Sequence, residues 1–192
     1  MFQWRRRRER GATLVEAALA FPILILVIIS ILELGMAFKD YLTVSYLSRE
    51  AARIGALAGN DEFADCAILL GIEDLATRGD LERLENVRIY RASPITGEEI
   101  SGDANTAQWV GAVNPQCTPG GDPSDSWTIL STGWDPLDRE TSVGPDLSPD
   151  IIGVQIRLRR NWITGFPPFR GEFEINERTI TRMEPKAFYP AP

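Results

Sequence analysis

Hydrophobic and polar residues are distributed unevenly along this chain. Sixteen consecutive uncharged and mostly large apolar residues run from Ala17 to Leu32. As a helix this run would be about 24 Å long, slightly short of a hydrocarbon core of roughly 30 Å. Extension to Phe38 gives 22 residues and places Glu33 near the outer edge of the bilayer, where a carboxylate costs less than at the centre. The pattern predicts one membrane-spanning helix.

An amphipathic pattern continues from the end of this run. Between residues 39 and 59, apolar residues recur every two to four positions, which is typical of a helix with one apolar face. That face consists of Tyr41, Leu42, Val44, Leu47, Ala51, Ile54 and either Leu57 or Ala58. Gly59 and Asn60 indicate the end of the helix. Small residues near this end would allow close packing, either on the chain's own globular domain or against a neighbouring subunit.

After residue 60 the elements become shorter. Residues 61–78 predict a second helix, and residues 80–85 predict a turn or short helix. Beyond them the period changes to that of strands. We expect a strand beginning at Val87, a loop over 93–106, an interruption at 166–169, and strands over 108–113, 127–130, 153–160 and 173–183. The predicted fold class is α+β, with the long helix packed on a small antiparallel β-sheet.

The charges beside the apolar run predict its orientation. Five arginines and one glutamate give the first eleven residues a net side-chain charge of +4, while Lys39 and Asp40 mark the other end. Because an excess of Lys and Arg keeps its end of a span in the cytoplasm, we expect residues from about 39 onward to be exported. A cleaved secretory signal would have a shorter apolar run and a small-residue cleavage site. Since the helical pattern continues past the run, we reject that interpretation.

Glu16 is the only charge within the first half of the apolar stretch, five residues after Gly11. A carboxylate in a membrane is expensive unless it is paired. One interpretation places Glu16 at headgroup depth near a helix N-terminus, where the helix dipole favours a negative charge. The other interpretation gives Glu16 a function, and this interpretation depends on a resemblance to a known family.

The segment resembles the leader of type IV prepilins, and a longer stretch is similar to TadE-like minor pilins (pseudopilins) of the tight-adherence pilus system. A phrase of the type R-G-x-x-x-V-E-x-A-L-x-x-P opens the span, and A-A-R-x-G-A follows it. The likeness is close over residues 10–58 and weaker over 151–185, which include the closing RTITRMEP. Ala17 is a departure, because many relatives carry an aromatic residue after the glutamate.

The resemblance implies a role for each matching residue. Gly11 would be the last leader residue, where a prepilin peptidase cuts, and Ala12 would be the new N-terminus. Glu16 would be the fifth residue of the mature chain and would set the register between subunits, and Pro22 would lie in the first turns of the span. The implied partners are the prepilin peptidase, other pilin and minor pilin subunits, and the inner-membrane assembly platform.

Composition excludes several other functions. Without the eleven leader residues the chain has 15 basic and 26 acidic side chains, a net charge of −11. An exported part this acidic argues against binding of nucleic acid or anionic lipid. The absence of histidine excludes Ser-His-Asp and Cys-His catalysis. A hydrolase built on paired carboxylates would need two of them facing each other across a cleft, and we do not favour it.

The two cysteines, Cys66 and Cys117, favour a disulfide because an exported chain meets oxidising conditions. Closing a loop of about 52 residues would stabilise the domain by roughly 4 kcal/mol on the chain-entropy estimate. Two free buried thiols are the alternative. A metal site is not expected from two cysteines without histidine.

Acidic clusters and tryptophans are the remaining candidates for ligand binding. The acidic groups could bind Ca²⁺ through oxygen, but none has the spacing of a calcium-binding loop. They are Asp61, Glu62 and Asp65; Glu98, Glu99 and Asp103; and Asp122, Asp125, Asp135 and Asp138. We favour solvated loop charge for them and expect no metal or cofactor. For Trp109, Trp127, Trp134 and Trp162, packing in the core or on the sheet is favoured over stacking on sugars.

The leading hypothesis is a non-catalytic minor pilin, held in the bacterial inner membrane with its C-terminal domain in the periplasm, and supporting pilus biogenesis and surface adhesion. Its expected parts are a leader (1–11), a transmembrane helix (12–38), an amphipathic continuation (39–59) and an exported α+β domain (60–192). The alternative is an uncut membrane-anchored periplasmic binding module that uses the loops at 93–150. A plain anchor needs neither Gly11 nor Glu16.

Overall fold

The computed structural model describes residues 3–111, 116–118, 122–124, 126–144, 148–165, 167 and 169–185, with side chains from residue 13 onward except at residues 116, 122 and 124. The chain divides into two compact units. The first unit contains residues 1–39 and 161–171, and the second contains residues 40–160 and 172–192. Each unit is described by itself below.

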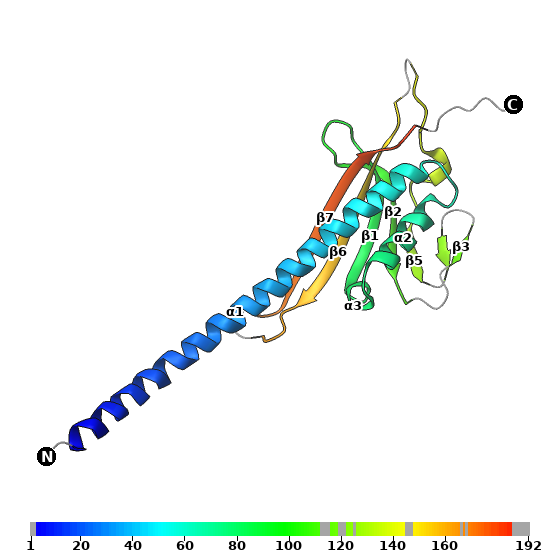
Figure 1. The fold of residues 1–192 in the computed structure, drawn as a ribbon. Coiled ribbons are helices and arrows are strands. Elements are labelled where there is room, and N and C mark those ends of the chain that lie inside the picture. Colours follow the sequence, from blue (N-terminus) through cyan, green and yellow to red (C-terminus); the bar gives the residue numbers. More distant parts are fainter. Residues whose placement is uncertain are drawn as a thin grey trace. The chain divides into compact units, whose positions relative to one another are not determined.

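One long helix, α1, opens the chain and runs over Gln3–Ala58 (Figure 1). It continues through Pro22, which lies inside the helix. Among the described residues, Thr13–Ala58 is a candidate membrane span, since an 18-residue window of it has a mean hydropathy of 2.7 and no buried residue. The apolar run and its amphipathic continuation therefore form one helix, as the sequence predicts.

The second unit contains a five-stranded antiparallel sheet, and its strand order is β5-β2-β1-β6-β7. Its strands are β1 (Leu84–Ala92), β2 (Glu99–Trp109), β5 (Trp127–Ser131), β6 (Ile151–Asn161) and β7 (Glu172–Arg182). A separate two-stranded sheet joins β3 (Gln116–Thr118) to β4 (Asp122–Ser124). The helical elements are α2 (Ala64–Leu75), α3 (Arg78–Leu81) and a 3₁₀ turn, η1 (Pro136–Asp138). The α+β fold class is confirmed.

The core of the second unit lies between the sheet and the helices α1 and α2. Apolar residues from these elements form one buried cluster, which includes Val44, Leu47, Ala51, Ile68, Leu69, Ile72, Val87, Ile89, Ile152, Val154, Ile156 and Leu158. Small residues allow this packing: a Cβ added at Gly55 would lie 2.6 Å from Ile152 Cδ1 and 2.8 Å from Ile68 Cδ1. The small-residue face at the end of α1 therefore packs on the chain's own domain, which is the first of the two predicted alternatives.

Several predicted elements are confirmed with small shifts. The second helix is shorter than 61–78, and α3 begins before the predicted residues 80–85 because Thr77 and Asp80 form a capping box at its start. The strand predicted over 153–160 is the centre of β6, with Val154, Ile156 and Leu158 fully buried on one face. The strands expected at 127–130 and 173–183 are β5 and β7.

The loop predicted over residues 93–106 is wrong, because strand β2 begins at Glu99. The first half of strand β2 is rich in residues that disfavour strands, among them Gly102 with a φ of 95°. Pairing with β1 on one side and β5 on the other holds it in the sheet. The strand predicted over 108–113 is wrong for the same reason: Gln108 and Trp109 end β2, and residues 112–113 lie outside the described residues.

Candidate functional site

The residues of the expected processing site lie in α1. Gly11 and Ala12 are helical, and their side chains lie outside the described residues. Glu16 and Ala17 are exposed on the same helix, and so is Pro22. Within the described residues, the Glu16 carboxylate has no hydrogen bond or ion pair.

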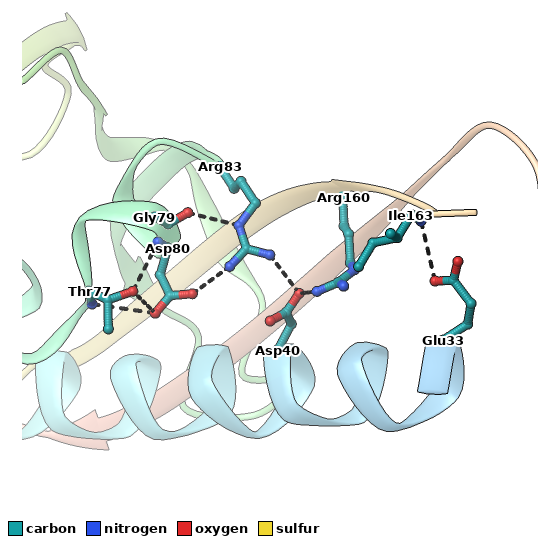
Figure 2. Close-up of polar contacts among 8 residues, drawn as sticks. All are labelled: Glu33, Asp40, Thr77, Gly79, Asp80, Arg83, Arg160 and Ile163. Carbon is teal, nitrogen blue, oxygen red and sulfur yellow. Dashed lines mark hydrogen bonds and ion pairs between the residues drawn. The ribbon is translucent and has the colours of Figure 1, made fainter. Parts of the chain in front are cut away.

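Glu33 differs from Glu16 because its side chain is fully buried, although it lies in the exposed apolar part of α1. Its carboxylate accepts hydrogen bonds from two consecutive backbone N–H groups, those of Ile163 at 3.3 Å and Thr164 at 2.6 Å. Figure 2 shows the first of these bonds. Hydrogen bonds from N–H groups to a carboxylate are among the stronger ones in proteins. The sequence predicted the depth of Glu33 but did not reveal its partner, the connection between β6 and β7.

A buried ionic network in the second unit surrounds Asp40, whose side chain is 1% exposed. Arg160 from the end of β6 and Arg83, which follows α3, both bind its carboxylate, the latter at 2.9 Å (Figure 2). Arg83 also donates to Asp80 at 2.6 Å and to the carbonyl oxygen of Gly79 at 2.8 Å. Two carboxylates and two guanidinium groups thus compensate one another, and they join α1, α3 and the sheet.

A second buried network lies beside the disulfide. Asn105 of β2 donates from Nδ2 to Asp65 at 2.6 Å and to the carbonyl oxygen of Trp134 at 2.7 Å. Its Oδ1 accepts from the backbone N–H groups of Gly133 and Trp134 at 2.8 and 2.9 Å. Asp65 also binds Arg139, whose guanidinium lies 4.5 Å from the centre of the Trp134 ring. Asn105 therefore fixes the segment around Gly133 to the sheet.

A cavity of about 310 Å³ opens next to this second network. It is lined by the polar residues Asp65, Asn105 and Asp138, by Trp134, and by apolar residues of the sheet. A cavity of this size with a few polar groups is at the lower limit of small-molecule sites. It is one of the concave features of the described second unit on which a binding role would rest.

The predicted disulfide is present and joins Cys66 to Cys117. Cys66 is buried in α2, and Cys117 belongs to β3, so the bond ties the small two-stranded sheet to the helix. Its Cα–Cα distance of 5.7 Å is ordinary for a disulfide. The alternative of two free thiols is wrong for this structure.

The tryptophans pack against protein, as the favoured interpretation predicted. Trp127 and Trp134 are buried in the core cluster, and Trp109 packs against it. Trp162 belongs to the first unit, where its ring centroid lies 4.9 Å from that of Phe169. Within the described residues, no group of three or more acidic or cysteine side chains is arranged to hold a metal ion.

Ion pairs and burial shift several pKa values in the second unit. Arg88 makes a two-pronged bond to Glu99, at 2.5 and 2.7 Å, which lowers the pKa of the Glu99 carboxyl group below its ordinary value of 4.5. The backbone N–H of Ser142 donates a hydrogen bond to the Glu140 carboxylate and likewise lowers its pKa. Burial raises the pKa of Tyr90. These groups are spread over the unit and do not converge on one acid–base site.

The fold and these sites define a class: a protein with one N-terminal apolar helix suited to membrane anchoring, followed by an α+β unit stabilised by a disulfide and buried ion pairs. Comparison with known families narrows this class. The model of the TadE-like protein family matches residues 11–53, which confirms the resemblance over that segment. The match suggests a component associated with the tight-adherence pilus. Proteins of the TadE-like family are generally non-catalytic. No curated protein and no solved structure matches the chain.

Proposed function

We propose that this chain is a minor pilin, or pseudopilin, of a tight-adherence pilus, and that a prepilin peptidase cuts it after Gly11. The observation that carries the proposal is the family match, which begins at Gly11 and contains Glu16. The uncovered apolar surface of α1 supports it, because a minor pilin keeps its apolar helix after processing. The protein would contribute to pilus biogenesis and, through the assembled pilus, to surface adhesion.

The proposal assigns a place to each part of the chain. Residues 1–11 would form the leader on the cytoplasmic side of the inner membrane, where the arginines hold it. Residues 12–38 would cross the membrane, 39–59 would continue the helix, and 60–192 would form the periplasmic domain. The peptidase, the assembly platform and other pilin subunits would be the partners, and the protein could reach the cell surface after assembly.

Glu16 would act between subunits. It is exposed and lacks a binding partner within the described chain, and cleavage would free the α-amino group of Ala12 four residues away. Glu16 of one subunit would pair with this amino group on a neighbouring subunit, which offsets the cost of holding both charges in a membrane and fixes the axial register of the helices.

The first experiment is the intact mass and N-terminal sequence of the protein, purified from membranes of cells that contain the cognate peptidase. We expect a chain that begins at Ala12. Gly11→Val should leave the leader attached, whereas Gly35→Val is the matched control in the same helix, since a side chain at Gly35 meets no atom within 4 Å. A wild-type chain that begins at Met1 or Phe2 would refute processing.

The second experiment tests the register. Glu16→Ala should permit cleavage but block incorporation into pili, measured by immunoblotting of sheared pili and of membranes. Glu50→Ala, which removes a half-buried carboxylate of α1 that pairs with Arg53, is the control and should assemble. Normal incorporation of the Glu16→Ala protein would show that the carboxylate does not set the register.

The cavity beside Asn105 and Trp134 favours a second candidate, an uncut membrane-anchored binding module in the periplasm. This function requires the cavity to be occupied, whereas pilus assembly does not. Thr132 lines the cavity and has an exposed side chain, so Thr132→Trp should fill it from its open side. Loss of phenotype in the filled variant, together with an uncut N-terminus, would favour the binding module over the pilin.

A further inference from the structure

The connection between β6 and β7 exposes apolar side chains in the first unit. Residues 161–171 belong to this unit together with the apolar part of α1. Ile163 is 62% exposed, and Trp162 and Phe169 are half-buried against each other, with an angle of 53° between their ring planes. Removing the exposed surface of these three side chains from water would be favourable.

This loop is attached to the apolar helix at one level. The N–H groups of Ile163 and Thr164 bind the Glu33 carboxylate, so the loop lies against the turn of α1 that contains Glu33. Leu32 and Leu34, on either side of Glu33, are 59% and 56% exposed. At this level of the first unit, apolar side chains of both the helix and the loop are therefore exposed.

The depth of Glu33 identifies what covers the loop. Glu33 is the first charged residue after the uncharged run that ends at Leu32, and Lys39 follows within two turns. This level corresponds to the boundary between hydrocarbon and headgroups if the helix spans a bilayer. Tryptophan is enriched at that boundary because its ring is apolar and its N–H is polar. Arg170, exposed beside Phe169, can reach lipid phosphates.

We propose that Trp162, Ile163 and Phe169 form a second contact with the bilayer, in its outer interfacial layer, beside the span. The occupant of this apolar surface is lipid, because the bonds to Glu33 hold the loop at the level where the spanning helix leaves the hydrocarbon. Glu33 is the positioning residue: its carboxylate holds the loop backbone against the helix, and the backbone N–H groups shield the charge from hydrocarbon. The inference rests on the membrane anchoring in the proposed function, and does not depend on processing or assembly.

The test is quenching of tryptophan emission by lipids brominated at the 6 and 7 positions of one chain. The full chain is reconstituted into phosphatidylcholine–phosphatidylglycerol vesicles, in a Trp4→Phe background that removes the only tryptophan of the leader. We expect a quenchable component that is lost in Trp162→Phe. The matched control, Trp109→Phe, removes a tryptophan of the second unit and should retain that component. Glu33→Ala should reduce the quenching of Trp162, because the loop loses its attachment.

Resistance to alkaline carbonate extraction is measured on the same vesicles. It distinguishes failure of the loop proposal from failure of the membrane anchor. If the chain resists extraction but Trp162→Phe changes no quenching, the loop proposal is wrong and the anchor stands. If the chain is extracted, the anchor itself fails, and the loop proposal fails with it. If Trp162 emits at short wavelength but is insensitive to brominated lipid, a second copy of the chain covers the loop, and this too overturns the proposal.

Discussion

Asp40→Asn tests the buried network of the second unit most directly. The substitution keeps the shape of the side chain but removes the negative charge that Arg83 and Arg160 share. Arg160 is nearly inaccessible to solvent, so its guanidinium would lose its ionic partner without gaining water. Arg83 is less affected, because it keeps Asp80 as a partner and is about one-third exposed.

The expected loss in the free energy of unfolding follows from the burial of the Asp40 ion pair. Removing one partner of a buried ion pair costs roughly 3–5 kcal/mol, and we expect a value near 3 kcal/mol because Arg83 remains paired. The control is Glu82→Gln, which breaks the exposed pair between Arg78 and Glu82 and should cost about 0–1 kcal/mol. For a chain of this size 1 kcal/mol corresponds to about 2–4 °C in melting temperature. Asp40→Asn should therefore melt about 6–12 °C lower, and the control at most about 4 °C lower.

The assay is thermal unfolding of the full chain in detergent micelles, followed by near-ultraviolet circular dichroism from the buried tryptophans Trp127 and Trp134. A double-mutant cycle with Arg160→Met isolates the pair, and the double variant should cost less than the sum of the single variants by about 1 kcal/mol or more. If Asp40→Asn is no more destabilising than Glu82→Gln, or if the single effects add, the network does not stabilise the unit as argued.

Three further predictions concern the same unit. Replacing both Cys66 and Cys117 by alanine should lower the free energy of unfolding by roughly 4 kcal/mol, measured by urea denaturation with and without reductant; an equal loss in reductant for wild type and variant would contradict it. Arg88 lowers the pKa of Glu99 in the folded protein, so the stabilisation by this pair is present above the unfolded pKa near 4.5 and disappears as the pH falls through the folded pKa. Melting temperatures measured between pH 3 and 7 should therefore decline less towards acid pH in Glu99→Gln than in the wild type. An equal decline in both proteins would refute this. Gly133→Ala should destabilise by about 1–3 kcal/mol, because its Cβ would overlap the carbonyl oxygen of Gly102; alanine at Gly79 of α3, which faces open space, should have little effect in the same melting assay.

Periodicity predicted the elements in which one face is apolar. The second half of the long helix and strand β6 both have this property and were located in this way, whereas the first half of the helix was located from its continuous apolar run. Strand β2 has four consecutive buried residues, Ala104 to Ala107, and two of them are polar. Asn105 is buried because Asp65 and the Gly133–Trp134 backbone satisfy its amide. Those partners are remote in sequence, so no local pattern could have predicted this strand.

The network around Asp40 left a signal in the sequence that the prediction did not use. In β6, Val154, Ile156 and Leu158 occupy the inward face, and the alternation places Arg160 on that same face. A guanidinium that continues an apolar face needs a carboxylate partner. The signal therefore called for a buried acid but did not specify that it comes from α1, because that depends on how the helix packs on the sheet.

Three carboxylates of α1 now separate into two kinds. Glu33 and Asp40 are seven residues apart, about two helical turns, so they lie on nearly the same face of α1. Each receives its donors from the chain itself: backbone N–H groups for Glu33 and two guanidinium groups for Asp40. Glu16 is exposed and receives none from the described residues. Because a carboxylate in a membrane is costly unless it is paired, Glu16 is the carboxylate of these three for which the proposed intersubunit pairing with the amino group of Ala12 has to be tested, by the Glu16→Ala assembly experiment.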